Sequence, residues 1–370
     1  MSNSRTTCSP PIELEDAQRQ IGQYRLQRLL GSGGMGEVYL AEHPMIKRPC
    51  AIKIIRADKA GDRRALARFE REVRATAALS HWNTVDIYDF GRTADGTLYL
   101  VMEYLRGMNL SELVQEYGPL PADRVVHLMR QACDALTEAH GLDLIHRDLK
   151  PANIFAALRG GLYDVTKLID FGLAKPLHSL AGSDLTLEGS FTGSPLYMSP
   201  EQASGDDEHD KRSDIYSLGA VMYFLLTGRP PFDYDKPLKV IMAHSYETPR
   251  HLSELVPNVP DSLQQIILRC LKKDPDERFQ DAEHLALALD WSRLARSWSR
   301  TRAAQWWVER HTGGFRLSEA PLVSSDLTET LDSEKLTKTI KVAGKQHNCA
   351  ASPQASKPNR NTSGSPAATP

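Results

Sequence analysis

The sequence HRDLKPAN, which begins at His146, and the sequence DFG, which begins at Asp170, constrain this chain more than any other part of it. Asp148 can orient an attacking hydroxyl and accept its proton, and Lys150 can neutralise charge on a phosphoryl group in transfer. Asn153 and Asp170 offer the hard oxygen ligands that Mg²⁺ prefers. The two segments therefore predict the transfer of a phosphoryl group from ATP to a hydroxyl.

A glycine-rich run precedes these segments. It begins at Leu30 and contains Gly31, Gly33 and Gly36. Glycines let backbone amides approach phosphates without a side-chain clash. A G-x-G-x-x-G run can also open a dinucleotide-binding βαβ unit, but a helix should then follow it. Here residues 37–41 alternate like a strand, so the run predicts a hairpin folded over a nucleotide.

A single lysine, Lys53, lies inside the apolar, strand-like run of residues 51–55. A buried ammonium needs a partner. Residues 68–79 follow helical spacing, and Glu72 from this helix could pair with Lys53 and aim it at the α and β phosphates. Glu70 is the competing partner. A lysine that snorkels to the surface is the alternative interpretation.

With these motifs in this order, the chain resembles the protein-kinase superfamily from about Tyr24 to about Leu289. It is most similar to the eukaryotic-like serine/threonine kinases of bacteria. The matching segments read LGSGGMGEVYLAEH, HRDLKPANI, DFGLAK, GSPLYMSPEQA, RSDIYSLGAVMYFLLTGRPPF and KKDPDERFQDAEHL. The resemblance implies an α+β, two-lobed protein kinase fold, with a small antiparallel-sheet lobe and a mainly helical large lobe. It implies a serine/threonine protein kinase that transfers the γ-phosphoryl of ATP to protein hydroxyls and autophosphorylates in its activation segment.

The resemblance also assigns roles to matching residues. The catalytic residues it implies are Asp148, Lys150, Lys53 and Glu72, and the metal ligands are Asn153 and Asp170. The nucleotide-binding residues it implies are Leu30, Gly31, Gly33, Gly36, Val38, Ala51, Lys53, Met102, Glu103, Leu105 and Phe155. Met102 is the expected gatekeeper before a hinge whose backbone would bind the adenine. The implied cofactors are ATP and Mg²⁺, with Mn²⁺ as a substitute.

Regulation is expected in the activation segment, residues 170–201. In similar kinases the arginine before the catalytic aspartate keeps an unpaired positive charge until a phosphate on this segment neutralises it. The candidate regulatory residues are Arg147, Thr186, Ser190, Thr192 and Ser194. We expect Thr186 to be the main autophosphorylation site, with Glu188 as a fixed negative charge. The alternative is that Glu188 is a solvated loop residue.

Lys150, two positions after Asp148, is the arrangement that resembles kinases acting on serine and threonine. Protein substrates are therefore the expected partners, and a transient homodimer would allow autophosphorylation in trans. An ATP-binding pseudokinase that acts as a scaffold is the alternative from another class. Its usual mark is loss of the strand lysine or of the aspartate in HRD or DFG, and all three are present here.

The composition agrees with this interpretation. The chain has 370 residues, 41% hydrophobic and 25% charged, enough for a two-lobed core, and its formal net charge of -2 argues against a main role in coating nucleic acid. Five scattered cysteines without metal-type spacing suggest reduced thiols and a cytoplasmic location. The most apolar stretch, residues 218–226, is too short to cross a bilayer, so we expect no transmembrane segment.

We divide the chain into four parts by pattern. Residues 1–23 are expected to be a flexible N-terminal segment, and residues 24–290 the kinase domain, with a small lobe over about 24–105 and a large lobe over about 106–290. Residues 291–312 are expected to be a basic, tryptophan-rich amphipathic helix, for which packing against the large lobe is favoured over binding a partner, a membrane or nucleic acid. Residues 313–370, rich in Ser, Thr, Lys and Pro, are expected to be disordered.

Four further expectations concern structural support. Gly160 and Gly161 should form the turn of a lengthened hairpin. By resemblance, Glu201 and Arg278 should form a buried ion pair, and Asp214 should cap the backbone of the catalytic loop. Thr76 stands where related kinases often stack an apolar residue against the DFG aromatic. This predicts a regulatory helix that is held less firmly, and low basal activity.

Overall fold

The computed structural model describes residues 20–33, 36–55, 63–171, 195–204, 210–292, 294 and 296–310, with residues 63–69 described by their backbone alone. All of these belong to the first of two compact units into which the chain divides, residues 1–316. The second unit, residues 317–370, lies outside the described residues.

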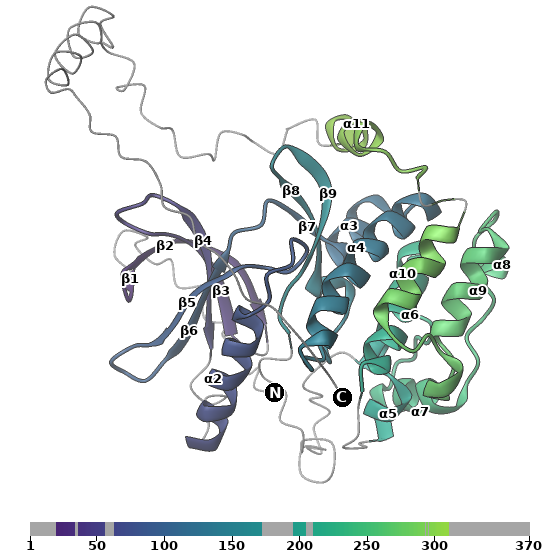
Figure 1. Ribbon diagram of the computed structural model, residues 1–370, viewed down its shortest axis with the longest axis horizontal. Helices are drawn as coiled ribbons and strands as arrows, with labels where there is room; N and C mark the ends of the chain where they lie inside the picture. The colour runs from purple at the N-terminus through teal and green to yellow at the C-terminus, as the bar shows by residue number, and fades with distance from the viewer. Residues whose placement is uncertain are drawn as a thin grey trace, which may run out of the picture. The chain divides into compact units, whose positions relative to one another are not determined.

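The N-terminal part is a six-stranded antiparallel sheet with the strand order β1-β2-β3-β4-β6-β5 (Figure 1). Its strands are β1 (Gln20–Ile21), β2 (Tyr24–Gly33), β3 (Gly36–Glu42), β4 (Pro49–Ile55), β5 (Ile87–Arg92) and β6 (Leu98–Glu103). In β4, Cys50 and Ile52 enter one apolar cluster, whereas Ala51 and Ile55 enter another. Because neighbouring strand residues face opposite sides, both faces of the sheet are covered.

The glycine-rich run forms the β2–β3 hairpin, as the strand-like alternation after the glycines predicted. Gly33 pairs with Gly36 across the hairpin end. Gly36 has a φ of 147°, and a Cβ there would lie 1.8 Å from the carbonyl oxygen of Ile54. Glycine is therefore required at position 36 by the fold of the hairpin against β4.

Helix α2 (Arg63–Ala77) confirms the helix expected after β4. Val73 and Thr76 are buried, so the helix packs one of its faces against the lobe. The Thr76 hydroxyl donates a hydrogen bond of 2.9 Å to the carbonyl oxygen of Glu72, one turn earlier. This bond satisfies the buried hydroxyl inside its own helix.

The C-terminal part is mainly helical, which confirms the two-lobed α+β prediction. Its α-helices are α3 (Leu110–Tyr117), α4 (Ala122–Gly141), α5 (Pro200–Ser204), α6 (Arg212–Thr227), α7 (Pro237–Tyr246), α8 (Leu252–Leu255), α9 (Asp261–Cys270), α10 (Ala282–Trp291) and α11 (Arg300–Arg310). Its 3₁₀ turns are η1 (Pro151–Asn153), η2 (Pro195–Tyr197) and η3 (Pro275–Glu277). Helix α6 is buried along most of its length, so it forms the centre of the lobe. Over the described residues, no helix combines the length and apolarity that crossing a bilayer would require.

A three-stranded sheet, β7 (Gly107–Asn109), β8 (Ile154–Arg159) and β9 (Leu162–Leu168), carries the chain between the two signature segments. Gly160 and Gly161 form the turn between β8 and β9 with φ values of 56° and 77°, which confirms the expected hairpin. Thr84 forms an isolated bridge with Leu168 at the end of β9. The hairpin therefore touches the small lobe at this point.

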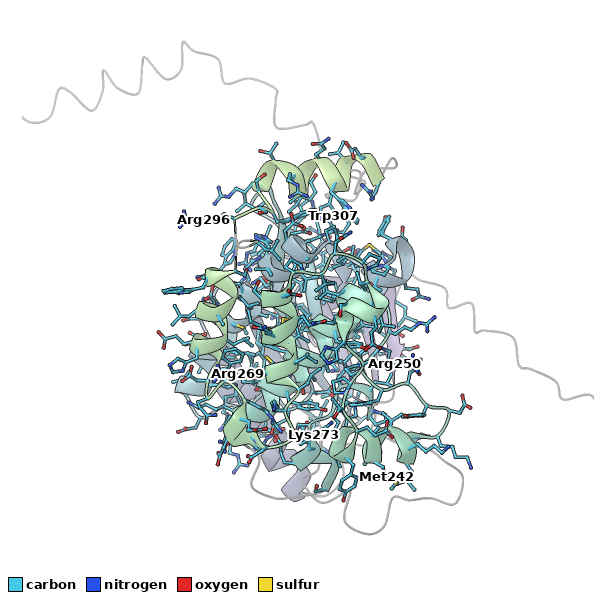
Figure 2. The ribbon with its side chains drawn as sticks, turned by 90° about the vertical axis from the view of Figure 1, so that its right-hand side faces the viewer. Met242, Arg250, Arg269, Lys273, Arg296 and Trp307 are labelled. Carbon is cyan, nitrogen blue, oxygen red and sulfur yellow. The ribbon has the colours of Figure 1, made fainter. Side chains whose placement is uncertain are left out.

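The region after residue 290 differs from the single helix expected over 291–312. Helix α10 ends at Trp291, where the Ser292 hydroxyl donates to the carbonyl of Leu289, and α11 begins only at Arg300. The indole of Trp298, in the non-helical stretch between them, is buried. Trp307, on α11, is also buried, and in Figure 2 it lies between α11 and the rest of the lobe. At Trp298 and Trp307 the segment packs against the large lobe, as the favoured interpretation expected, whereas residues 311 and 312 lie outside the described residues.

Candidate active site

Two side chains of the HRDLKPAN segment, Lys150 and Asn153, converge on Asp148. Lys150 Nζ donates to Asp148 Oδ2 at 2.8 Å, and Asn153 Nδ2 donates to the same oxygen at 3.0 Å and to the Asp148 carbonyl at 2.8 Å. Asn153 is held in turn by η1, the 3₁₀ turn that ends at it. Two donors therefore fix the orientation of one carboxylate, which suits a group that must meet an incoming hydroxyl.

The backbone of this loop is capped by Asp214, near the start of α6, as expected. Its two carboxylate oxygens accept from the amides of His146 and Arg147, at 2.9 and 3.0 Å. Burial by itself raises the pKa of Asp214, but the hydrogen bond and charge of His140 outweigh it and lower this pKa below its ordinary value. Arg147 has a φ of 63°, and the cap holds this strained backbone in place.

The DFG segment meets the small lobe through Asp170. Lys53 Nζ lies 2.7 Å from Asp170 Oδ1, with the lysine side chain buried and the aspartate half-buried. Asp170 has a φ of 58°, the second strained backbone in the site. Lys53 thus has an acidic partner, as a buried lysine requires. A contact between Lys53 and Glu72 stays a prediction.

Hard oxygen donors for a divalent cation lie just before β8, at Asn153, and just after β9, at Asp170. The amide of Ile169 donates to the carbonyl oxygen of Asn153 at 3.0 Å, which places the residue before Asp170 beside Asn153. The side-chain nitrogen of Asn153, Nδ2, donates to Asp148. The side-chain oxygen, Oδ1, is therefore the atom that Asn153 can offer a cation. Together with the carboxylate of Asp170, this donor set fits Mg²⁺, which commonly takes one or two protein ligands plus phosphate and water.

Four of the expected adenine-binding residues belong to one apolar cluster of the small lobe. Ala51 pairs with Met102 across β4 and β6, and both belong to one buried cluster, against which Val38 and Leu105 pack. Leu30, on β2, is exposed, and Phe155, on β8, is half-buried. An apolar surface on the small lobe and a ring on the large lobe is the arrangement that a flat base would need.

Gly31 and Gly33 show a different pattern from Gly36. A Cβ at either position would meet no described atom within 4 Å. The fold of the described residues therefore gives no steric reason for glycine at these two positions. Space beside their backbone fits the close approach of a phosphate.

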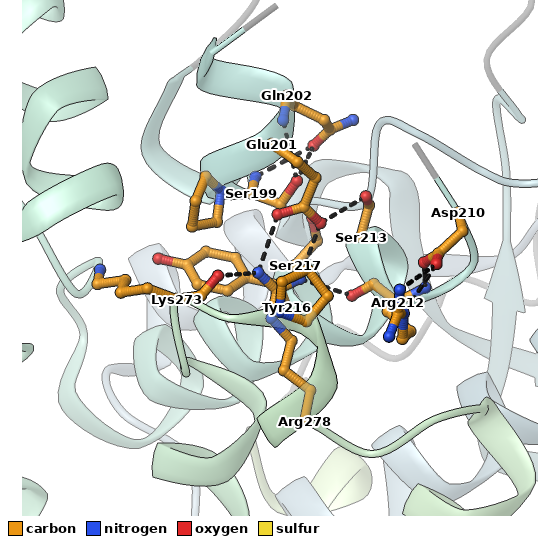
Figure 3. Close-up of polar contacts among 12 residues, drawn as sticks. Ser199, Glu201, Gln202, Asp210, Arg212, Ser213, Tyr216, Ser217, Lys273 and Arg278 are labelled. Atoms are coloured by element: carbon orange, nitrogen blue, oxygen red, sulfur yellow. Dashed lines mark hydrogen bonds and ion pairs between the residues drawn. The ribbon is translucent and has the colours of Figure 1, made fainter. Parts of the chain in front are cut away.

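The expected ion pair between Glu201 and Arg278 is confirmed. Arg278 donates from Nη1 and Nη2 to the two carboxylate oxygens, at 2.8 and 2.9 Å, and Ser213 donates to Glu201 at 2.7 Å (Figure 3). Burial by itself raises the pKa of Glu201, but the bonds and charge of Arg278 outweigh it and lower this pKa to about 2. The pair ties α5, at the end of the activation segment, to the turn after η3.

The four hydroxyl residues proposed for regulation, Thr186, Ser190, Thr192 and Ser194, lie outside the described residues. Their partner in the hypothesis, Arg147, is described. Within the part of the chain that the structure covers, its Nε is buried and has no hydrogen-bond partner. The carbonyl oxygen of Arg147 accepts from Gln202 on α5 at 3.0 Å, a contact that sequence reasoning missed.

Sequence reasoning also missed the support of the hinge. Lys167 Nζ lies 2.9 Å from Glu103 Oε2, and Arg159 Nη1 lies 2.6 Å from Glu103 Oε1. The one signal in the sequence was the lengthened β8–β9 hairpin, which carries both cations. The pattern of residues gave no reason to pair them with Glu103.

The sequence of this chain was compared with protein families and with known proteins. Residues 24–290 match the family model described as "Protein kinase domain". The chain is 39% identical over 264 residues to the serine/threonine-protein kinase pkn3 of Myxococcus xanthus, covering 70% of this chain and 48% of that protein. It is 40% identical over 268 residues to PrkC of Bacillus subtilis, covering 72% of this chain and 40% of that protein. The matched region thus spans less than half of the length of these relatives.

Solved structures agree. Crystal structures of the PknI kinase domain of Mycobacterium tuberculosis match this chain with TM-scores of 0.57 to 0.59. One of them, with a TM-score of 0.59 and 29% sequence identity, covers 75% of this chain and 98% of that chain. The family match over residues 24–290 spans both lobes, including the capped loop around Asp148 and the segment of Asp170. This chain belongs to the protein kinase family.

Proposed function

We propose that the protein is a serine/threonine protein kinase that transfers the γ-phosphoryl of ATP to hydroxyl groups of protein substrates. The observation that carries the proposal is the convergence of Lys150 Nζ and Asn153 Nδ2 on one oxygen of Asp148, at 2.8 and 3.0 Å. Phosphoryl transfer needs positioning and charge neutralisation rather than a covalent intermediate. This arrangement supplies both.

In this mechanism Asp148 orients the substrate hydroxyl and accepts its proton. Lys150, hydrogen-bonded to Asp148, brings positive charge to the group being transferred, and Lys53 brings it from the small lobe. Asn153 and Asp170 would hold Mg²⁺, which supplies charge neutralisation at the phosphates when bound. Mn²⁺ accepts the same oxygen ligands, so it would serve as a substitute.

The glycine-rich run between β2 and β3 and the hinge would hold the nucleotide itself. Gly31 and Gly33 leave space for the phosphates, and the apolar face around Ala51 and Met102 would cover the adenine. The backbone of residues 103–105 would bind the base by hydrogen bonds. Glu72 is proposed as the helix carboxylate that aims Lys53 when nucleotide is bound.

Two observations support the proposal that serine or threonine is the acceptor residue. Lys150 lies two positions after Asp148, and the relatives pkn3 and PrkC are named serine/threonine-protein kinases. After incubation with ATP and Mg²⁺, phosphoamino-acid analysis of the labelled protein should yield phosphoserine and phosphothreonine. Phosphotyrosine as the main product would contradict the acceptor class.

Activation is proposed to follow phosphorylation of Thr186. The buried Nε of Arg147 has no partner among the described residues, and a phosphate is a strong acceptor for it. Mass spectrometry of the purified protein after incubation with ATP should find phosphate on Thr186. Phosphate confined to Ser190, Thr192 or the tail would defeat this assignment.

The comparisons do not support the alternative of a pseudokinase scaffold, since the relatives are named as kinases and all the expected polar groups are present. Protein substrates are the proposed partners, with a transient homodimer for autophosphorylation in trans. We propose a cytoplasmic location, where reduced thiols such as those of Cys50, Cys133 and Cys270 persist. Labelled ATP with and without a generic protein acceptor separates the kinase from the scaffold.

A further inference from the structure

A buried ion pair lies in the large lobe, on the side of the β8–β9 hairpin away from the small lobe. Arg124 on α4 and Asp164 on β9 both have side chains that are 0% exposed. Arg124 donates from Nε to Asp164 Oδ2 at 2.9 Å and from Nη2 to Oδ1 at 2.8 Å. A buried pair of this kind needs further hydrogen bonds to offset the cost of removing two charges from water.

Two tryptophans from beyond the kinase-family match supply these bonds. Trp298 Nε1 donates to Asp164 Oδ2 at 2.9 Å, and Trp307 Nε1 donates to Oδ1 at 2.7 Å. The guanidinium of Arg124 lies 3.8 Å from the ring centroid of Trp306. Each carboxylate oxygen thus accepts one guanidinium bond and one indole bond. The segment 296–310 completes a site whose other half lies inside the family match.

The opposite side of the same strand meets the small lobe. Asp164 and Lys167, both on β9, contact opposite sides of the hairpin, because Asp164 pairs with Arg124 of α4 and Lys167 binds Thr84 of the small lobe. Lys167 is 0% exposed, and its Nζ donates to the carbonyl oxygen of Thr84 at 2.8 Å besides pairing with Glu103. The indoles of Trp298 and Trp307 therefore hold one face of the strand, and Lys167 on the other face contacts the hinge residue Glu103.

Glu103 is the first residue of the proposed hinge. Its carboxylate is held by two cations of the hairpin, Lys167 and Arg159, at 2.9 and 2.6 Å. Its amide donates to the carbonyl oxygen of Asp86 at 2.8 Å. Both its side chain and its backbone are thus fixed, and a shift of β9 would move the carboxylate and the hinge together.

We propose that Trp298 and Trp307 are positioning residues for the nucleotide site, because they fix Asp164 and thereby hold Lys167 of the same strand against Glu103 of the hinge. The inference rests on the proposed function, in which the hinge backbone binds adenine. The tryptophans touch neither nucleotide nor substrate. Their effect is to set the position of the surface that receives the base.

The test uses the full chain with Trp298→Phe and Trp307→Phe, which remove the indole donors and keep aromatic rings. We expect KM for ATP to rise about tenfold in each variant, since a charge-assisted hydrogen bond is lost. We expect kcat at saturating ATP to change by less than about twofold, since the groups around Asp148 are untouched. The dissociation constant of a non-hydrolysable ATP analogue, measured by calorimetry, should rise with KM.

Further variants separate positioning from general stability. Lys167→Met should raise KM at least as much, and Lys167→Arg should restore part of the loss. The double variant Trp307→Phe with Lys167→Met should be no weaker in ATP binding than Lys167→Met alone, because the two residues act through one strand. Trp291→Phe is the control, since this indole is 85% exposed at the end of α10. All assays run well below each variant's unfolding midpoint.

Three results would overturn the inference while the proposed function stands. In the first, the wild type binds ATP, and both tryptophan variants have the wild-type KM for ATP and differ from the wild type only in a lower thermal stability. In the second, the effects of Trp307→Phe and Lys167→Met are additive. In the third, Trp291→Phe shifts KM as much as the buried positions do. A wild type that binds no ATP analogue would instead count against the proposed function.

Discussion

Lys53 Nζ lies 2.7 Å from Asp170 Oδ1, so one ion pair joins β4 of the small lobe to the second residue after the end of β9 in the large lobe. The lysine side chain is buried and the aspartate half-buried. Both groups belong to the set proposed to face the phosphates and the metal. The pair therefore links the positions of the two lobes at the point where the reaction would take place.

Replacement of Lys53 by Met should abolish most of the phosphoryl transfer. The variant loses a positive charge that acts on the phosphates, and it leaves Asp170 without its partner, so kcat should fall about 100-fold or more. The measurement is transfer of label from ATP to a generic protein acceptor. Lys47→Met is the matched control, because Lys47 is 66% exposed in the loop between β3 and β4. A Lys53→Met protein as active as this control would contradict the assigned role.

Replacement of Arg278 by Met should destabilise the large lobe strongly. Glu201 would be left as a buried charge without its cation, at a cost of about 3–5 kcal/mol in the free energy of unfolding. Urea unfolding followed by circular dichroism measures this cost. Lys272→Met is the control, since Lys272 and its partner Glu277 are both more than half exposed and their pair should contribute less than about 1 kcal/mol. Equal stability losses in the two variants would argue against the buried pair.

The same pair predicts a pH dependence. The pKa of Glu201 is about 2 in the folded protein, against an ordinary value of 4.5. A lowered folded pKa means that the stabilisation is fully present above pH 4.5 and is lost as the pH falls from there to about 2. The contribution is about 3 kcal/mol. The difference in unfolding free energy between wild type and Glu201→Gln should therefore shrink in acid, and a difference that grows in acid would contradict the account.

Replacement of Thr76 by Leu should raise basal activity. Thr76 is buried on α2, and its hydroxyl donates a hydrogen bond to the carbonyl oxygen of Glu72. The rings of His146 and Phe171 pack against each other, with their centroids 4.5 Å apart. A larger apolar side chain should hold α2 more firmly, with a gain of several-fold in the initial rate of autophosphorylation. Thr76→Val, which removes the hydroxyl at nearly constant volume, is the control. An unchanged rate in Thr76→Leu would count against this role.

The sequence predicted those parts of the site in which chemistry requires a residue type at a fixed local spacing. Asp148, Lys150 and Asn153 lie within six consecutive positions, and the loop geometry brings their side chains together. The strand around Lys53 could be predicted because its apolar neighbours alternate between two buried clusters. Local patterns of this kind determine both the element and the direction of its side chains.

The sequence could not predict contacts that depend on tertiary docking alone. Trp307 and Asp164 are 143 positions apart, and nothing near either residue identifies the other as its partner. The prediction of one helix over 291–312 was wrong for the same reason. The chain leaves the helix after Trp291 and re-enters one at Arg300, and between them Trp298 is buried against Asp164. Tertiary packing overrode helical spacing there.

The central claim is that Asp148 serves as the base in phosphoryl transfer to protein hydroxyls. The most direct measurement compares transfer of label from ATP to a generic protein acceptor by wild type, Asp148→Asn and Asp143→Asn, at saturating ATP and Mg²⁺. Asp143 is an exposed residue just after α4, and its φ of 56° is one that Asn tolerates. We predict that Asp148→Asn loses about 100-fold or more of the rate with unchanged affinity for an ATP analogue, while Asp143→Asn keeps the wild-type rate. A wild type that binds ATP without transferring label, or an Asp148→Asn protein as active as wild type, would contradict the account.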